Sequence, residues 1–264
     1  MYRGLNLGSG KITEREMRGV PHHLLSVASP KRIYGVSLFQ KEARKAVQGI
    51  LGRGRLAYIV GGSPQYVYAL VDGHVFPDVS PNHSLRKRLE ALDPKELYRM
   101  LVKKDPARAM ALGQGNPRRI IRALEIIEAT KKPIAALAHD PLPSPTLFLG
   151  LSRAKEDLQK RVRARLQKRL CQGMVAEVQR LRNSGVSWKR LESLGLEYRY
   201  IALYLQKRIR KEEMARRIQK ESEDFARRQM AWFKKDPRIR WVSNRREAFR
   251  LVREFRQAPG QECF

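Results

Sequence analysis

The spacing of apolar residues in the first part of the chain predicts alternating strands and helices. His23–Val27 and Leu56–Val60 are short apolar runs, which predict two buried strands. Between them the pattern predicts a helix that is capped by Ser37 and runs to about Gly52, and a further helix begins near Pro64. Strands that alternate with helices in this way are typical of a parallel α/β sheet.

The second half of the chain is patterned mainly as helix. A turn-rich link with three prolines at 140–145 precedes a strand over Thr146–Ser152. Helices are predicted over about 153–183, 189–206, 210–235 and 245–256, with a short strand at Ile239–Val242 before the last of them. The predicted fold class is therefore α/β, a parallel sheet with a helical insertion and a helix-rich C-terminal half.

These elements predict four segments. Residues 1–80 form the first part of the α/β core, and residues 81–143, which are punctuated by proline, form the helical insertion. Residues 144–258 form the second, mostly helical part of the core, and residues 259–264 form a tail.

The charge of the chain narrows the class of partner. Lys and Arg number 55 against 26 Asp and Glu, a formal net charge of +29, which favours a polyanion such as nucleic acid. Two distant cysteines, Cys171 and Cys263, exclude a disulfide framework. No apolar stretch is long enough to span a bilayer, so we expect a cytoplasmic protein with no membrane partner.

Polar residues interrupt an apolar stripe near the C-terminus. Ile218, Phe225 and Trp232 are spaced seven apart, which places them on one helix face. Ser222 and Gln229 fall on that face, with Arg228 at its edge. Such polar groups either form hydrogen bonds inside the core or line a cavity, and the pattern alone favours the core.

A second candidate is the arginine-rich helix that Asn116 opens. Arg118 and Arg122 share one face, where guanidinium groups suit phosphate oxygens. A solvated face paired with Glu125 is an equally good interpretation of the same pattern. Leu5–Ile12 is the nearest match to a phosphate-binding loop, but Leu5 replaces the first glycine and Ile12 the hydroxyl, so we reject it.

Taken in order, eight motifs of the chain resemble those of the bacterial tRNA dimethylallyltransferase family. Residues 2–11 (YRGLNLGSGK) are similar to its Y-R/K-G-x-D-I-G-T-A-K, and residues 54–63 (GRLAYIVGGS) to its G-R-x-P-x-x-V-G-G-T. Further matches lie at residues 19–25, 39–43, 118–125, 153–178, 194–199 and 226–233. The resemblance covers nearly the whole chain and implies a sheet like that of phosphate-loop nucleotide-binding folds.

The resemblance implies a reaction and its partners. The family transfers a dimethylallyl group from dimethylallyl diphosphate to the N6 amine of the adenosine that lies 3′ of the tRNA anticodon, with Mg²⁺ at the diphosphate. The adenine leaves the anticodon stem-loop and enters a channel. We expect a monomer. By motif match, Gly61, Gly62 and Ser63 border the channel, Arg228 and Gln229 line its wall, and Arg86, Arg118, Arg119, Arg122 and Arg228 contact tRNA.

The chain also departs from the family pattern. Met1-Tyr2 falls inside the family's D-S-x-Q-x-Y motif, so the general-base aspartate and the phosphate-binding loop have no counterpart in residues 1–264. Asn6, Glu223 and Ala231 replace the family's aspartate, arginine and threonine. We therefore expect a tRNA dimethylallyltransferase without its N-terminal catalytic segment; the alternative is a catalytically inactive tRNA-binding remnant of the family.

Overall fold

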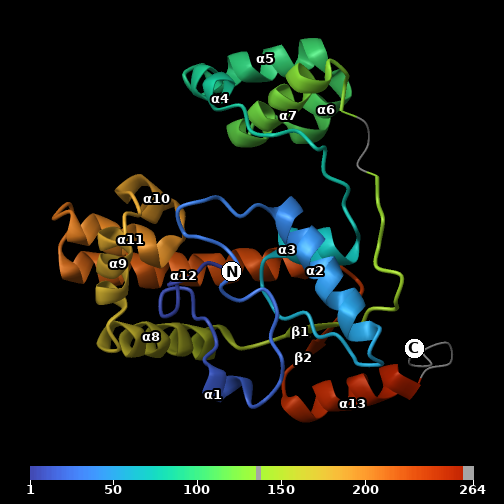
Figure 1. The fold of residues 1–264 in the computed structure, drawn as a ribbon, viewed down its shortest axis with the longest axis vertical. Coiled ribbons are helices and arrows are strands. Elements are labelled where there is room, and N and C mark those ends of the chain that lie inside the picture. The colour runs from blue at the N-terminus through green and yellow to red at the C-terminus, as the bar shows by residue number, and fades with distance from the viewer. Residues whose placement is uncertain (135–137, 258–264) are drawn as a thin grey trace. The chain divides into compact units, whose positions relative to one another are not determined.

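Two parallel strands form the sheet of the described chain. The computed structural model describes residues 1–134 and 138–257 (Figure 1). Strand β1 (Phe148–Leu151) pairs with β2 (Ile239–Val242), with Phe148 opposite Ile239 and Leu151 opposite Val242. The strands predicted at 146–152 and 239–242 are confirmed, and so is their parallel direction. The predicted tail at 259–264 lies outside the described residues.

The two strands predicted near the N-terminus are wrong. Leu24 and Ser26 have φ values of 62° and 56°, in the left-handed region that a strand cannot contain. Leu56–Val60 forms no strand, and its Tyr58 and Val60 side chains are 70% and 94% exposed. An apolar run becomes a buried strand only when neighbours cover it, and within the described residues no strand pairs with either segment.

The chain divides into two compact units. The first comprises Met1–Val71 and the chain from Leu142 onward, and the second comprises Asp72–Pro141. The first unit holds β1, β2 and these helices: α1 (Glu14–Met17), α2 (Val36–Leu51), α3 (Pro64–Val71), α8 (Lys155–Cys171), α9 (Met174–Asn183), α10 (Trp188–Ser193), α11 (Leu196–Leu205), α12 (Lys211–Phe233) and α13 (Arg245–Gln257).

Several helix boundaries differ from the predicted ones. Helix α2 is capped by the backbone of Gly35 rather than by Ser37, so it begins at Val36. The long helix predicted at 153–183 is two helices, because Gly173 has a φ of 93°, which ends α8 and redirects the chain into α9. The predicted helix at 189–206 is likewise divided into α10 and α11 at Leu194-Gly195.

Helices α8 to α12 bury a shared apolar core. Side chains from four of these helices are less than 2% exposed in this cluster. Burial of each such side chain contributes about 1.5–3 kcal/mol, so this cluster fixes the first half of α12 in place. These side chains include Met174, Val178, Leu191, Ile201, Met214 and Ile218.

In its described residues, the second unit is a bundle of four helices. They are α4 (His83–Glu90), α5 (Pro94–Lys104), α6 (Pro106–Leu112) and α7 (Pro117–Thr130). Proline occupies the first turn of α5, α6 and α7, and an Asp or Asn side chain at each N-cap accepts a hydrogen bond from a backbone N–H of that turn. Leucine and isoleucine from α4, α5 and α7 form the core. No helix in the described part of the chain is long and apolar enough to cross a membrane.

Candidate functional site

The glycine turn before α3 contacts the second half of α12. The side-chain amide of Gln229 donates a hydrogen bond from Nε2 to the carbonyl oxygen of Gly62. A Cβ at position 62 would collide with that amide, so glycine permits the close approach. The structure thus brings together Gly62 and Gln229, two site residues predicted from the sequence. Gln229, a polar residue on the apolar stripe, forms its hydrogen bond with backbone outside the core.

The residues around this contact are open to solvent. Ser63 is exposed, and its carbonyl accepts hydrogen bonds from the N–H groups of Tyr66 and Val67 at 3.0 and 3.1 Å, which starts α3. Gly61 and Arg228 are exposed as well. A side chain or RNA group can therefore reach Ser63 and Arg228 without moving the helices.

The predicted apolar stripe of α12 is buried only at its start. Ile218 is 1% exposed, but Phe225 and Trp232 are 44% and 54% exposed. The expectation of one buried face is wrong for this second half, because the helices of the main core cover α12 only near Met214 and Ile218. Polar residues on the stripe also have two different roles, since Ser222 lines a small cavity whereas Gln229 holds Gly62.

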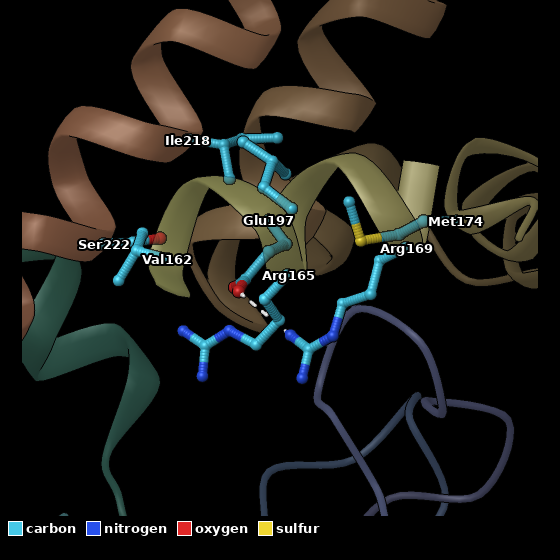
Figure 2. A pocket seen from close by; sticks show the side chains of 8 residues that line it. Val162, Arg165, Arg169, Met174, Glu197, Ile218 and Ser222 are labelled. Carbon is cyan, nitrogen blue, oxygen red and sulfur yellow. Dashed lines mark ion pairs between the residues drawn. The ribbon is translucent and has the colours of Figure 1, made fainter. Parts of the chain in front are cut away.

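That cavity lies among α8, α9, α11 and α12 (Figure 2). Arg169 Nη1 lies 3.9 Å from Glu197 Oε1, and Arg165 lies one turn earlier on α8. Burial raises the pKa of Glu197, and the two arginines oppose that shift. Ser222 is the residue that the sequence singled out here, and none of the residues assigned to the site by motif match lines this cavity.

In the helical unit, two predicted tRNA-contacting arginines hold one buried carboxylate. Glu125 on α7 is 1% exposed. Arg86 on α4 donates from Nε and Nη2 to its two oxygens at 2.9 and 2.8 Å, and Arg122 donates from Nη1 at 2.5 Å. The backbone N–H of Asn82 adds a fourth bond at 2.6 Å. The solvated Arg122–Glu125 pair considered from the sequence is thus a buried cluster that joins two helices.

The ionisation of Glu125 should stabilise the helical unit. Burial by itself raises its pKa, but hydrogen bonds from Arg86, Arg122 and Asn82 outweigh burial and lower the pKa from 4.5 to about 2. A lowered pKa adds stability above pH 4.5, and that stability is lost as the pH falls toward 2. The shift corresponds to about 3 kcal/mol.

We therefore expect Glu125→Gln to remove a pH-dependent part of the unfolding free energy. Between pH 6 and 3, wild type should lose stability relative to the variant, because the Glu125 carboxylate takes up a proton in the unfolded chain while it stays ionised in the folded one. Denaturant titrations of both proteins across this range measure the difference. A constant difference at every pH would contradict the assigned pKa shift.

Arg118 and Arg119 have a different environment from Arg86 and Arg122. Both are exposed in the first turn of α7, directly after Pro117. Neither guanidinium has an ion-pair partner among the described residues. Cations at a helix N-terminus are disfavoured by the helix dipole, so this placement does not serve helix stability.

A buried glutamate that the sequence did not single out as a site residue organises the N-terminal segment. Glu177 on α9 accepts hydrogen bonds from the N–H groups of Asn6, Leu7 and Gly8 at 3.0, 2.7 and 3.1 Å, and from the Tyr198 hydroxyl at 2.8 Å. Burial, together with the Glu177 carboxylate, raises the pKa of Tyr198. The sequence showed Glu177 only as part of a family motif, and no local pattern predicts partners this far away in the chain.

A family model and several relatives match this chain. The model described as IPP transferase matches residues 1–236. A tRNA dimethylallyltransferase of Thermomicrobium roseum is 36% identical over 246 residues, which covers 91% of this chain and 75% of the relative. That of Kineococcus radiotolerans is 38% identical, with 92% of this chain and 77% of the relative covered.

Solved structures share the fold. The tRNA isopentenylpyrophosphate transferase of Bacillus halodurans gives a TM-score of 0.68 at 29% identity, and the match covers 96% of this chain and 83% of that one. A eukaryotic dimethylallyltransferase described as acting on tRNA gives 0.69 at 22% identity, with 97% and 66% covered, which supports the fold alone. The family model matches most of this chain, and the relatives are more than a third identical to it. The chain therefore belongs to the IPP transferase family.

Proposed function

We propose that this chain transfers a dimethylallyl group from dimethylallyl diphosphate to the N6 amine of the adenosine 3′ of the anticodon in tRNA. The allylic carbon forms a bond to N6 as its bond to the diphosphate oxygen breaks, and the amine loses a proton. The observation that carries the proposal is the match to relatives named tRNA dimethylallyltransferase over 91% of the chain. An inactive tRNA-binding remnant is not favoured, because these relatives are named as enzymes.

The proposed channel wall is the contact between the glycine turn and α12. Gln229 fixes the carbonyl of Gly62, and Gly61 and Ser63 flank it on the same turn. A fixed turn can hold a substrate group in one position, which lowers the entropic cost of reaching the transition state. Arg228 is exposed beside Gln229 and supplies positive charge for the diphosphate or an RNA phosphate.

The proposed tRNA contacts of the helical unit begin with Arg118 and Arg119. Their charges lie unpaired at the N-terminus of α7, where both the side chains and the helix dipole attract a phosphate. This interpretation explains a placement that weakens the helix itself. It also agrees with the net charge of +29.

Replacing Arg118 and Arg119 together with glutamine should weaken binding of an anticodon stem-loop. Loss of two phosphate contacts should also flatten the slope of log affinity against log salt by about 1.5. Fluorescence anisotropy between 50 and 300 mM salt measures both quantities. The matched control is Arg245→Gln with Arg246→Gln, an exposed arginine pair in the first turn of α13. Equal losses in the two double variants would assign the effect to net charge alone.

The remaining parts of the proposal come from the family resemblance. A Mg²⁺ ion would neutralise the diphosphate, but within residues 1–134 and 138–257 no three acidic, histidine or cysteine side chains come together as a metal site. We therefore derive no step through the metal. The same proposal includes a sheet of the phosphate-loop type and a monomeric state. It also includes a cytoplasmic location, where the tRNA substrate is found.

A cellular experiment tests the activity. The natural coding region of this protein should restore dimethylallyladenosine to tRNA in a bacterium that lacks its own enzyme for this modification. Nucleoside mass spectrometry of the purified tRNA detects the product. Expression of the protein without any dimethylallyladenosine would overturn the proposed function.

A further inference from the structure

The cluster around Glu125 holds more positive charge than the buried carboxylate needs. One arginine neutralises one carboxylate, yet both Arg86 and Arg122 bind Glu125, which leaves a net charge of +1. A well-packed apolar side chain would serve stability equally well at this position. The second arginine therefore indicates a role besides folding.

Both guanidinium groups have donors left over. Arg86 uses Nε and one N–H of Nη2 on Glu125, and Arg122 uses one N–H of Nη1 on Glu125 and one of Nη2 on the carbonyl of Val79, at 2.8 Å. A guanidinium carries five N–H groups, so three on each arginine have no partner among the described residues. The side chains are 30% and 35% exposed, which leaves these donors within reach of a ligand.

The carboxylate also fixes the geometry of the two arginines. Glu125 is itself held by the Asn82 N–H and by its burial in the core that α4, α5 and α7 share. Long arginine side chains lose conformational freedom when they bind a ligand, and a carboxylate that restrains both beforehand reduces that cost. Two restrained guanidinium groups with free N–H donors are suited to a phosphate group.

We propose that Glu125 is a positioning residue, which holds Arg86 and Arg122 as a fixed pair for one backbone phosphate of the tRNA anticodon stem-loop. The proposal rests on the proposed function and adds a residue that does not touch the RNA itself. It also gives Arg86 and Arg122 a role different from that of Arg118 and Arg119, whose charges are not restrained by any described acid.

The variant Glu125→Gln separates positioning from net charge. It makes the protein one unit more positive, which by itself should tighten binding to any RNA. Positioning predicts the opposite for the specific ligand, about tenfold weaker binding, as expected when a charge-assisted hydrogen bond to phosphate is lost. Glu128→Gln is the matched control, because it makes the same charge change on the exposed side of α7, where Glu128 pairs with Lys104 and Lys131.

The experiment measures binding of both variants and wild type, as the full chain, to an anticodon stem-loop and to a scrambled stem-loop of equal length. We expect Glu125→Gln to bind only the anticodon stem-loop more weakly, with Glu128→Gln equal to wild type or tighter on both. Arg86→Lys keeps every charge but loses the forked donors, and it decides the matter if Glu125→Gln does not fold. Tenfold weaker specific binding by Arg86→Lys supports the proposal.

Two results would overturn it in distinguishable ways. The first is that Glu125→Gln binds the anticodon stem-loop as tightly as Glu128→Gln does, or that Arg86→Lys binds it as tightly as wild type does. Either outcome removes the positioning role of Glu125 while the proposed function stands. Wild-type protein that binds both stem-loops equally contradicts selective tRNA recognition, and it overturns the proposed function and this inference together.

Discussion

Replacing Gln229 with leucine is expected to slow dimethylallyl transfer about 100-fold while changing the melting temperature little. The reason is the hydrogen bond from Gln229 to the carbonyl of Gly62, which fixes the turn that we place at the channel. A displacement of about 1 Å at a reacting centre can cost that much in rate. Leucine fills a similar volume, and the position is only partly buried and lies outside the main apolar core, so stability should be preserved.

The experiment compares Gln229→Leu with wild type. Transfer rate and thermal unfolding are measured on the same preparation of each protein, made as the natural translation product. Gln219→Leu is the matched control, because Gln219 lies on the same helix and its side-chain amide donates a hydrogen bond to Glu223, four residues along α12. A large loss of stability with unchanged transfer in Gln229→Leu would make this glutamine a core partner and remove it from the site.

The backbone of Leu5–Ile12 is not available as a phosphate-binding loop. Leu5 is buried in the core, and the N–H groups of Asn6, Leu7 and Gly8 are already bound to the carboxylate of Glu177.

Local signals predicted the helices of this protein well. Asn116 followed by Pro117 started α7 as expected, and the apolar side chains of Ile120, Leu124 and Ile127 are buried as their spacing indicated. Capping, proline and helical periodicity act within a few residues, so the sequence contains the necessary information. Strands depend on distant neighbours, which is why β1 and β2 formed whereas Leu56–Val60 did not.

In the candidate site, too, local sequence signals identified residues but did not predict their distant contacts. Motif resemblance identified Gly62 and Gln229, but only the structure places the amide of one on the carbonyl of the other. Arg118 and Arg122 appeared equivalent on a helix face, yet Arg122 binds Glu125 and Arg118 is unpaired among the described residues. Arg122 also donates to the carbonyl of Val79, and Arg86 binds the same carboxylate. Both residues lie far earlier in the chain, where helical spacing cannot place them.

The most direct test of the proposed function is the position of the transferred group. The natural translation product, purified and incubated with labelled dimethylallyl diphosphate, should label a tRNA that carries adenosine 3′ of the anticodon. The same tRNA with guanosine at that position should take up no label, because it lacks the N6 amine. Equal labelling of the two tRNAs, or no labelling of either, would contradict the assignment of this chain as a transferase for that adenosine.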